Sequence, residues 1–490
     1  MPEHTIAENL TRLQTARTAI AGAITAKGGT VTSGDGFEDF PTDIATIPSG
    51  GGGGVPENDV TFYDYDGTVV AAYSKADFIA LSAMPANPTH EGLTAQGWNW
   101  LLADAKVYVT KYGRLNIGQM YITSDGKTRI KIKLEEGRLS PVLGFGIDGS
   151  VDVDWGDGTT HGTMTGSNVL TLVQLQHVYA AAGEYTIALT VTGSLSFLGS
   201  SAYAAAILRK AGVTSATAGE SKAYQNAMQE LYIGSGVTSI GTYAFQTCYS
   251  LASVTIPDNV TSIGTYAFQT CCSLTHVTIP DNVTSIAAAA FNNCTSLVSV
   301  TIPNGVTSIG AYAFQTCCSL THVTIPDNVT SIGTYAFQTC YSLASVTIPD
   351  NVTSIAAAAF YNCCSLASVT IPNGVTSIAA AAFYNCYSLA SVTIPDNVTS
   401  IAAAAFYNCC SLASVTIPDN VTSIGSQTFQ NCHSLAFIKF EGSIPPTAGG
   451  SDTFAGIPTD CIIYVPSGSL EDYESETNYP DPDVYTHVEY

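Results

Sequence analysis

The sequence has few charged residues, and the basic ones are the scarcest. Its 490 residues include 16 Lys and Arg against 39 Asp and Glu, so the formal net charge is −23, and charged residues make up only 11%. Lys and Arg are the residues that neutralise the phosphates of nucleic acids and of anionic lipids. The shortage therefore argues against nucleic acid and membrane surfaces as partners.

Long apolar runs are also missing. No apolar run approaches the roughly 18 residues that a membrane helix requires, and the N-terminal residues show no basic segment followed by an apolar stretch. We therefore expect no membrane insertion and no secretory signal. Hydrophobic residues nevertheless make up 46% of the chain, enough to bury a large core. Ser, Thr, Asn, Gly and Tyr must cover much of the surface.

A 23-residue repeat fills the second half of the chain. The same interval relates Leu251 through Leu435, Ile240 through Ile424 and Cys248 through Cys432. Nine phenylalanines share it: Phe245, Phe268, Phe291, Phe314, Phe337, Phe360, Phe383, Phe406 and Phe429. Repeats of this length are typical of solenoids, because one short unit cannot enclose its own apolar side chains.

Each unit contains the parts of one solenoid turn. In the unit Leu251–Ser273, Val254 and Ile256 alternate with polar residues, as in a short strand with one buried face. Pro257 ends this strand because it has no N–H to donate, and Asp258 begins the turn. Stacked units would bury one continuous core. We predict a solenoid of about nine 23-residue turns.

The repeat pattern L-x-x-V-x-I-P-x-x-V-x-x-I-x-x-x-A-F-x-x-C resembles the BspA-like leucine-rich repeat of bacterial and phage surface proteins. The resemblance spans residues 231–440. The segment Cys461–Tyr473 resembles the closing unit of that family, which implies a C-terminal cap for the solenoid. From Ala223 to Ile438 the array has no Lys, Arg or Glu apart from Glu230, so its surface is almost uncharged.

The cysteines invite a metal or disulfide interpretation. Thirteen of the 14 lie in the array, and nine of them occupy the column three residues after each phenylalanine, which suits a small buried side chain. Metal sites need converging Cys-x-x-Cys or His spacings, which the array lacks. We expect buried free thiols, with disulfides as the alternative, and no metal or other cofactor.

The N-terminal segment has the pattern of a helix with one apolar seam. Apolar residues alternate by four and three positions, with one arginine inserted: Ile6, Leu10, Leu13, Arg17, Ile20 and Ile24. This seam favours a coiled coil, expected to be a trimer, and the alternative is an amphipathic helix packed on its own domain. Residues 8–47, with Ala26–Gly29 and Phe37–Pro41, resemble N-terminal modules of phage and prophage tail proteins.

Two motifs follow the flexible linker of Ser49–Gly54. Phe62–Thr68 resembles the D-x-D-G-T motif of haloacid-dehalogenase-like phosphatases, but no doubly wound αβ series follows to supply the other ligands. We therefore interpret Asp64 and Asp66 as turn residues. Pro85–Trp98 resembles internalin-type B repeats, which are small β-rich surface modules.

The segment before the repeats carries a third resemblance. The sequence W-G-D-G-T at Trp155–Thr159, followed by His177–Tyr179 and Gly183–Thr192, resembles a β-sandwich domain of the polycystic-kidney-disease (PKD) type. This implies that Trp155 packs between sheets. Residues 203–210 and 221–231 are predicted to be short helices that lead into the solenoid.

The predicted protein is mostly β and multidomain. Its expected parts are an N-terminal helical attachment or oligomerisation module (1–47), a Gly-rich linker (48–56), a small β-rich module (57–140), a PKD-like β-sandwich (141–195), a helical connector (196–230), the BspA-like solenoid (231–440) and a C-terminal cap (441–490).

No arrangement of residues indicates catalysis, because the array offers only turn aspartates and lacks the paired acids of a glycan hydrolase. We therefore expect a non-enzymatic protein. The resemblances imply a receptor-binding protein similar to a phage tail fibre, built into the virion tail in the bacterial cytoplasm. It would assemble with itself and with other tail or baseplate proteins and attach to a host surface glycan or protein. The alternatives are a BspA-like adhesin on the bacterial cell surface and a purely structural virion spacer.

If the solenoid binds a receptor, two sets of columns are favoured. One is the outward column of the predicted strands, and the other is the tyrosine column before each phenylalanine. The residues are Ser253, Thr255, His276, Thr278, Thr301, His322, Thr324, Tyr243, Tyr266 and Tyr335. Neutral hydroxyl and aromatic groups suit hydrogen bonding and stacking with a neutral partner.

Overall fold

A computed structural model describes residues 59–490, apart from 66–67, 201–203, 206 and 211–223. Residues 59–490 form one compact unit. The predicted heptad helix, with Ile6, Leu10, Leu13, Arg17, Ile20 and Ile24, lies outside the described residues, as does the Gly-rich linker. Self-association through this helix stays a prediction.

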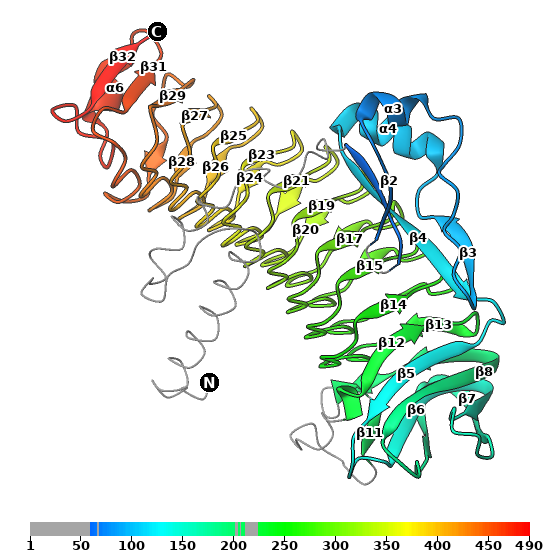
Figure 1. Cartoon of the computed structure of the whole chain (residues 1–490). Helices are drawn as coiled ribbons and strands as arrows, with labels where there is room; N and C mark the ends of the chain where they lie inside the picture. The colour runs from blue at the N-terminus through cyan, green and yellow to red at the C-terminus, as the bar shows by residue number, and fades with distance from the viewer. Residues whose placement is uncertain (1–58, 66–67, 201–203, 206, 211–223) are drawn as a thin grey trace, which may run out of the picture. The chain divides into compact units, whose positions relative to one another are not determined.

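The second half of the unit is a β-solenoid with two rows of short strands (Figure 1). The first row, which we call the strand row, consists of parallel strands of successive turns. Its members are β12 (Met228–Tyr232), β14 (Ser253–Thr255), β15 (His276–Thr278), β17 (Ser299–Thr301), β19 (His322–Thr324), β21 (Ser345–Thr347), β23 (Ser368–Thr370), β25 (Ser391–Thr393), β27 (Ser414–Ile417), β29 (Phe437–Phe440), β31 (Ile462–Val465) and β32 (Thr486–Glu489).

The second row contains two-residue strands for the most part. They are β13 (Val237–Ile240), β16 (Ser285–Ile286), β18 (Ser308–Ile309), β20 (Ser331–Ile332), β22 (Ser354–Ile355), β24 (Ser377–Ile378), β26 (Ser400–Ile401), β28 (Ser423–Ile424) and β30 (Thr447–Ala448). In both rows most strands pair in parallel with their equivalent one repeat later, as Val300 does with Val323, although no ladder joins β21 to β23, β25 to β27 or β22 to β24. The predicted solenoid is confirmed, with about 11 turns instead of nine, because turns without the full motif extend it at its ends.

The core of the solenoid consists of stacked identical side chains. The nine repeat phenylalanines form one ladder that Phe454 continues, with neighbouring ring centroids 5.2 to 5.9 Å apart. The thiols of the cysteines three residues after each phenylalanine stack beside the rings. In this column, every cysteine from Cys271 to Cys432 donates a hydrogen bond to a phenylalanine carbonyl, as Cys317 does to Phe291 at 3.3 Å. These side chains are fully buried, so every turn completes the core of its neighbours.

Two residues in most turns adopt a left-handed backbone. One column holds Tyr243, Tyr266 and Ala381 with φ near 55°, and the other holds Thr or Asn, as at Asn385. Such angles are uncommon for residues other than glycine, and Asn tolerates them best. The sequence shows no sign of this left-handed geometry, because the first column holds both Tyr and Ala.

All fourteen cysteines lie in the described ranges and are free; eleven are buried, which confirms the expectation for them, and Cys272, Cys318 and Cys410 are half-buried. Burial raises the pKa of thiols such as Cys317 and Cys386, and it raises the pKa of Cys318 to about 11. The thiolate is the form that reacts. At pH 8 we therefore expect iodoacetamide to label the native protein slowly and all fourteen thiols rapidly in urea, as counted by mass spectrometry. Rapid native labelling of Cys317 would contradict this burial.

A strongly curved antiparallel sheet closes the N-terminal end of the solenoid. Its strands are β5 (Thr128–Leu134), β6 (Pro141–Asp154), β7 (Gly162–Gln176), β8 (Gly183–Phe197) and β11 (Arg209–Lys210). β9 (Gly199–Ser200) and β10 (Ala204–Ala205) pair with each other in a separate two-stranded sheet. β5 pairs with β12, and β8 pairs with β13, so the sheet continues into both rows of the solenoid. Phe197 lies 5.0 Å from Phe245, which joins the two parts into one core.

This arrangement differs from the predicted domains in two ways. The expected boundary at residue 140 separates β5 from β6–β8, although all four belong to one sheet. The predicted helix at 203–210 is wrong where the structure describes it, since Ala204–Ala205 pairs with β9 and Arg209–Lys210 pairs with β6. Of the predicted helix at 221–231, the described part is helical only at Tyr224–Gln225, and Met228–Tyr232 pairs with β5. Pairing with an existing sheet overrides the local preference of the sequence. The PKD resemblance stays a prediction.

Residues 59–123 form a separate small αβ module, which we call the N-terminal module. Its elements are β1 (Val60–Tyr63), β2 (Val69–Tyr73), α3 (Lys75–Ala80), β3 (Leu93–Trp98), α4 (Leu102–Tyr112) and β4 (Leu115–Thr123). The strands are arranged in the order β2-β1-β4-β3. Its own core includes Phe62, Phe78 and Ile117.

The C-terminal end is closed by β30–β32 and by helix α6 (Leu470–Ser475). Tyr473 of α6 is fully buried against Phe440, and its hydroxyl donates to the Gly442 carbonyl at 2.7 Å. Among the described residues, no helix combines the length and apolar character needed to cross a membrane.

Candidate binding surface on the strand row

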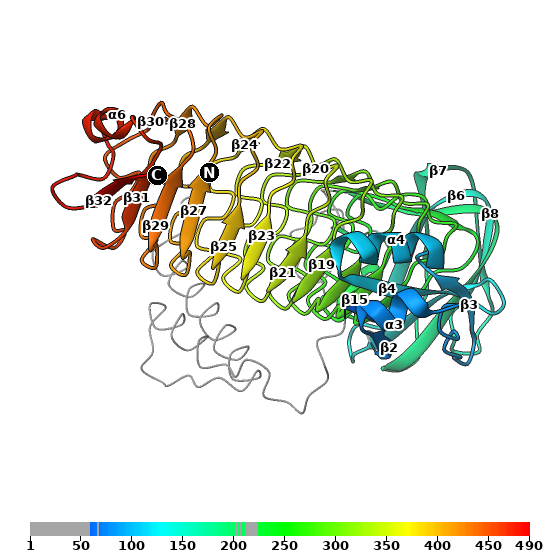
Figure 2. The same cartoon turned by 90° about the horizontal axis from the view of Figure 1, so that it is seen from above.

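The N-terminal module lies on the first part of the strand row (Figure 2). Its strand β4 contacts β14, β15, β17 and β19, so it crosses four successive turns. Tyr108 of α4 donates a buried hydrogen bond to the carbonyl of Ile325 at 2.9 Å, and the ring of Tyr63 lies 5.7 Å from that of His276. The module therefore covers this part of the solenoid surface.

The module buries most of the strand residues that the sequence analysis favoured for receptor binding. Thr255, Thr278 and Thr324 are buried, His276 is 1% exposed and Thr301 is 2% exposed. Ser253 and His322 are half-buried. The expectation that this column faces solvent is wrong for these five buried residues, because β4 occupies the space in front of them. The repeat interval itself does not encode a contact with a module from another part of the chain.

One sequence signal marks the covered part. His276 and His322 replace the serine that this column carries elsewhere, and both belong to turns beneath the module. The His276 ring nitrogens lie 2.6 Å from the Ser299 hydroxyl and 3.2 Å from the Thr278 hydroxyl. His322 repeats these contacts with Ser345 and Thr324. The histidines therefore order the hydroxyls that β4 contacts.

Further along the row, the strand surface is open (Figure 2). We call this part the open strand face and define it by the outward residues of β21, β23, β25 and β27: Ser345, Thr347, Ser368, Thr370, Ser391, Thr393, Ser414 and Thr416. The two central strands carry exposed residues, and the outer ones are half-buried. Four strands about 4.8 Å apart give it a width of roughly 20 Å.

The hydroxyls of the open strand face are available to a ligand. Within the described part of the chain, the side chains of Ser368, Thr370, Ser391 and Thr393 make no hydrogen bond to the protein. The threonines of the second row differ, since Thr399 donates to the carbonyl of Thr376 at 3.2 Å and its equivalents do the same. The second-row hydroxyls thus stabilise the stacking of turns, whereas those of Ser368, Thr370, Ser391 and Thr393 have no such role.

An aromatic pair follows the open strand face toward the C-terminus. Phe437 of β29 lies in register with Ser414, and Tyr464 of β31 lies in the column of Thr416 and Lys439. Their ring centroids are 5.8 Å apart. Lys439 beside them is held by Glu441 at 3.2 Å and by the ring of Tyr490 at 4.3 Å. The face is therefore a neutral hydroxyl floor between the N-terminal module and an aromatic edge.

The tyrosine columns favoured by the sequence lie on another side of the solenoid turn. Tyr243 stacks on Tyr266 with centroids 4.9 Å apart, and Tyr335 stacks on Tyr312 at 5.1 Å. Tyr243, Tyr266 and Tyr335 are half-buried. Because neighbouring rings cover one another, few ring faces remain for stacking against a sugar, so the strand row is the better candidate.

Two buried or half-buried histidine–aspartate pairs lie outside the solenoid. His90 lies 2.6 Å from Asp64 in the N-terminal module, and His177 lies 2.7 Å from Asp157 while stacking on Trp155. The described residues contain no cluster of three or more His, Cys, Asp or Glu suited to a metal. Each pair tethers a loop to its neighbouring strand, which fits the interpretation of Asp64 as a turn residue.

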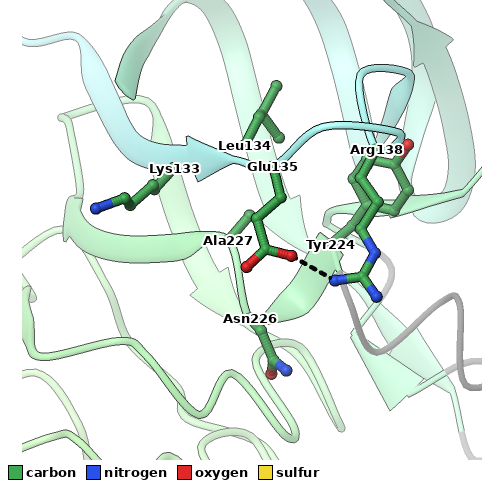
Figure 3. A pocket seen from close by; sticks show the side chains of 7 residues that line it. All are labelled: Lys133, Leu134, Glu135, Arg138, Tyr224, Asn226 and Ala227. Carbon is green, nitrogen blue, oxygen red and sulfur yellow. Dashed lines mark hydrogen bonds and ion pairs between the residues drawn. The ribbon is translucent and has the colours of Figure 1, made fainter. Parts of the chain in front are cut away.

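A small pocket lies where β5 meets the segment before β12 (Figure 3). It is lined by Lys133, Leu134, Glu135, Arg138, Tyr224, Asn226 and Ala227. Its volume is about 80 Å³, and an ion pair of 2.7 Å between Arg138 and Glu135 lies across it. Ligand sites usually enclose several hundred Å³, so this pocket is too small for a substrate.

Comparisons with known proteins agree with the repeat pattern. A family model described as the BspA type leucine-rich repeat region matches residues 218–344 and 330–456. No curated protein matches the chain. Solved structures that resemble it include a leucine-rich repeat protein from Bacteroides ovatus, with 29% identity and a TM-score of 0.44. That match covers 53% of this chain and 65% of the other, slightly less than two thirds of its length.

Two other solved structures are similar in sequence. A leucine-rich cell surface protein from Faecalibacterium prausnitzii is 31% identical, with a TM-score of 0.32, over 51% of this chain and 83% of its own. A leucine-rich repeat protein from T. pallidum is also 31% identical, with a TM-score of 0.31, over 38% of this chain and 83% of its own.

Proposed function

The solenoid of this chain belongs to the family of BspA-type leucine-rich repeat regions, and we propose that the protein is a non-enzymatic, adhesin-like binding protein of a bacterial cell surface. The open strand face would hold its macromolecular ligand. The observation that carries this proposal is the row of exposed hydroxyls, including Thr370 and Thr393, that make no hydrogen bond within the described structure. A surface location is supported by the relative from F. prausnitzii, which is described as a cell surface protein.

The chemistry of the face limits the ligand. Its hydroxyls can donate and accept hydrogen bonds, and none of its eight residues is charged. Such a surface suits a neutral glycan or an uncharged protein segment and offers no charge to phosphate or sulfate groups. The same absence of charge and of acid pairs on the open strand face supports binding without catalysis.

The relatives favour the adhesin alternative over the phage tail-fibre role that the sequence analysis placed first. The virion role, with its baseplate partners and trimeric helix, stays a prediction. Mass spectrometry of purified virions and of washed cell envelopes separates the two. We expect the protein in envelopes without phage induction, and recovery from virions alone would contradict the proposal.

Adding bulk and charge to the centre of the open strand face should abolish binding. In Thr370→Arg/Thr393→Arg, two long side chains replace exposed hydroxyls, so we expect at least a tenfold loss of binding by the labelled protein to intact host epithelial cells, measured by flow cytometry. The matched control is Thr376→Arg/Thr399→Arg, which adds the same charge to the exposed second row of the same turns. Equal losses in both variants would contradict the proposed site.

A further inference from the structure

The strand row already holds one occupant within the chain. β4 is an extended strand of nine residues, and it lies across β14, β15, β17 and β19 with all but one of its residues buried. This contact shows which kind of chemical group can pack against the outward Ser and Thr columns.

The contact is made by the main chain of β4. A Cβ atom placed on Gly118 would lie 2.4 Å from the Thr278 hydroxyl oxygen and 2.9 Å from the Thr301 hydroxyl oxygen. Both distances are shorter than any ordinary contact, so the backbone of β4 rests directly on two hydroxyls from adjacent strands. At this point the row accepts a glycine and leaves no room for a side chain.

The same surface continues beyond the module. The triplet Ser-Val-Thr forms β17 beneath β4, and it recurs in β21, β23, β25 and β27. β23 pairs with β25 in parallel register, as β19 does with β21, and the Ser and Thr columns continue along the row although no ladder joins β21 to β23 or β25 to β27. An extended chain placed on the open strand face would therefore meet the hydroxyl array that β4 meets, without His276 and His322.

We infer that the open strand face binds an extended, uncharged polypeptide segment of a partner protein, which contains glycine and crosses the strands as β4 does. This inference rests on the proposed function and specifies its ligand. The hydroxyls of Thr370 and Thr393 would pair with the partner's backbone N–H and C=O groups. Phe437 and Tyr464 at the edge would pack against an apolar side chain of the segment.

A glycan is the competing ligand, and two observations favour the polypeptide. The occupant touches the row with its peptide main chain at Gly118, and the open part carries the same Ser-Val-Thr triplet as β17 in the occupied part. The half-buried tyrosine columns, which could add aromatic contacts for a sugar, lie on another side of the turn and cover one another.

The test is a selection from a displayed library of random 12-residue peptides on the full chain, followed by affinity measurements with the enriched synthetic peptides. We expect glycine-containing peptides whose affinity falls at least tenfold on Thr370→Arg/Thr393→Arg but stays within twofold on Thr376→Arg/Thr399→Arg. Replacing the peptide's glycine with valine should cause a similar loss. Circular dichroism and urea midpoints of both variants establish that they fold.

Several outcomes would overturn the inference. They are a failure to enrich any peptide that depends on Thr370 and Thr393, tolerance of valine at the glycine position, and displacement of the peptide by neutral dextran oligosaccharides. Cell binding that still depends on these two threonines would then leave the proposed function standing with a different ligand. Cell binding that does not depend on them would refute the proposed function itself.

Discussion

Gly118→Ala is expected to release the N-terminal module from the solenoid. The new methyl group would lie 2.4 Å from the Thr278 hydroxyl oxygen and 2.9 Å from that of Thr301. β4 cannot rise locally without losing its other contacts, which include the hydrogen bond of Tyr108 to Ile325. We expect hydrogen exchange in β15, β17 and β19 to accelerate at least tenfold, as measured by mass spectrometry, while β25 and β27 keep their rates.

Two variants make this prediction specific. Gly183→Ala is the control, because the nearest atom to its new methyl group is 3.6 Å away on the Tyr185 ring. Adding Thr278→Ala to Gly118→Ala removes the closest colliding atoms and should restore part of the exchange protection. Unchanged exchange in Gly118→Ala would refute the tight contact and, with it, the precedent for peptide binding on the open strand face.

Phe337→Ala is expected to cause the largest loss of stability among single substitutions in the array. Phe337 is fully buried, with the rings of Phe314 and Phe360 each 5.4 Å away. Removing such a ring costs about 3–5 kcal/mol, because the burial is lost and a cavity remains. Urea unfolding followed by circular dichroism measures the change.

The control for this substitution lies in the same array. Val298→Ala removes two methyl groups from a side chain that is 48% exposed, so a change of less than about 0.5 kcal/mol is expected. A loss below about 1 kcal/mol for Phe337→Ala would show that neighbouring turns close the gap, contrary to a ladder of rigidly stacked rings. Because each turn contacts only its neighbours, a broadened transition is also expected.

The solenoid could be predicted from sequence because its determinants are local and repeated. Phe268, Cys271 and Val254 recur at one interval, and each contacts its own equivalents in the neighbouring turns. The repeat interval therefore predicts which residues are in contact. The predicted number of turns was too low, since β31 and β32 add turns to the solenoid that lack the 23-residue repeat motif. The left-handed positions, such as Ala381, were missed because neither Tyr nor Ala is a usual sign of that geometry.

The covered part of the strand row could not be predicted in the same way. β4 reaches Thr278 and Thr301 across more than one hundred and fifty residues of sequence, and nothing in the repeat encodes that contact. The substitutions at His276 and His322 mark the covered turns, but the sequence analysis placed both residues in the outward column favoured for receptor binding. Similarly, Met228–Tyr232 became a strand because β5 offered a partner, which no local pattern indicates.

The chain fixes one end of the hydroxyl floor with the N-terminal module and the other with Phe437 and Tyr464. The turns in between are nearly interchangeable, so gene duplication or deletion of a single 23-residue unit would lengthen or shorten the floor by about 4.8 Å while both borders remain intact. The number of 23-residue repeats can therefore change without new folding problems. It would set the length of ligand that the protein can hold.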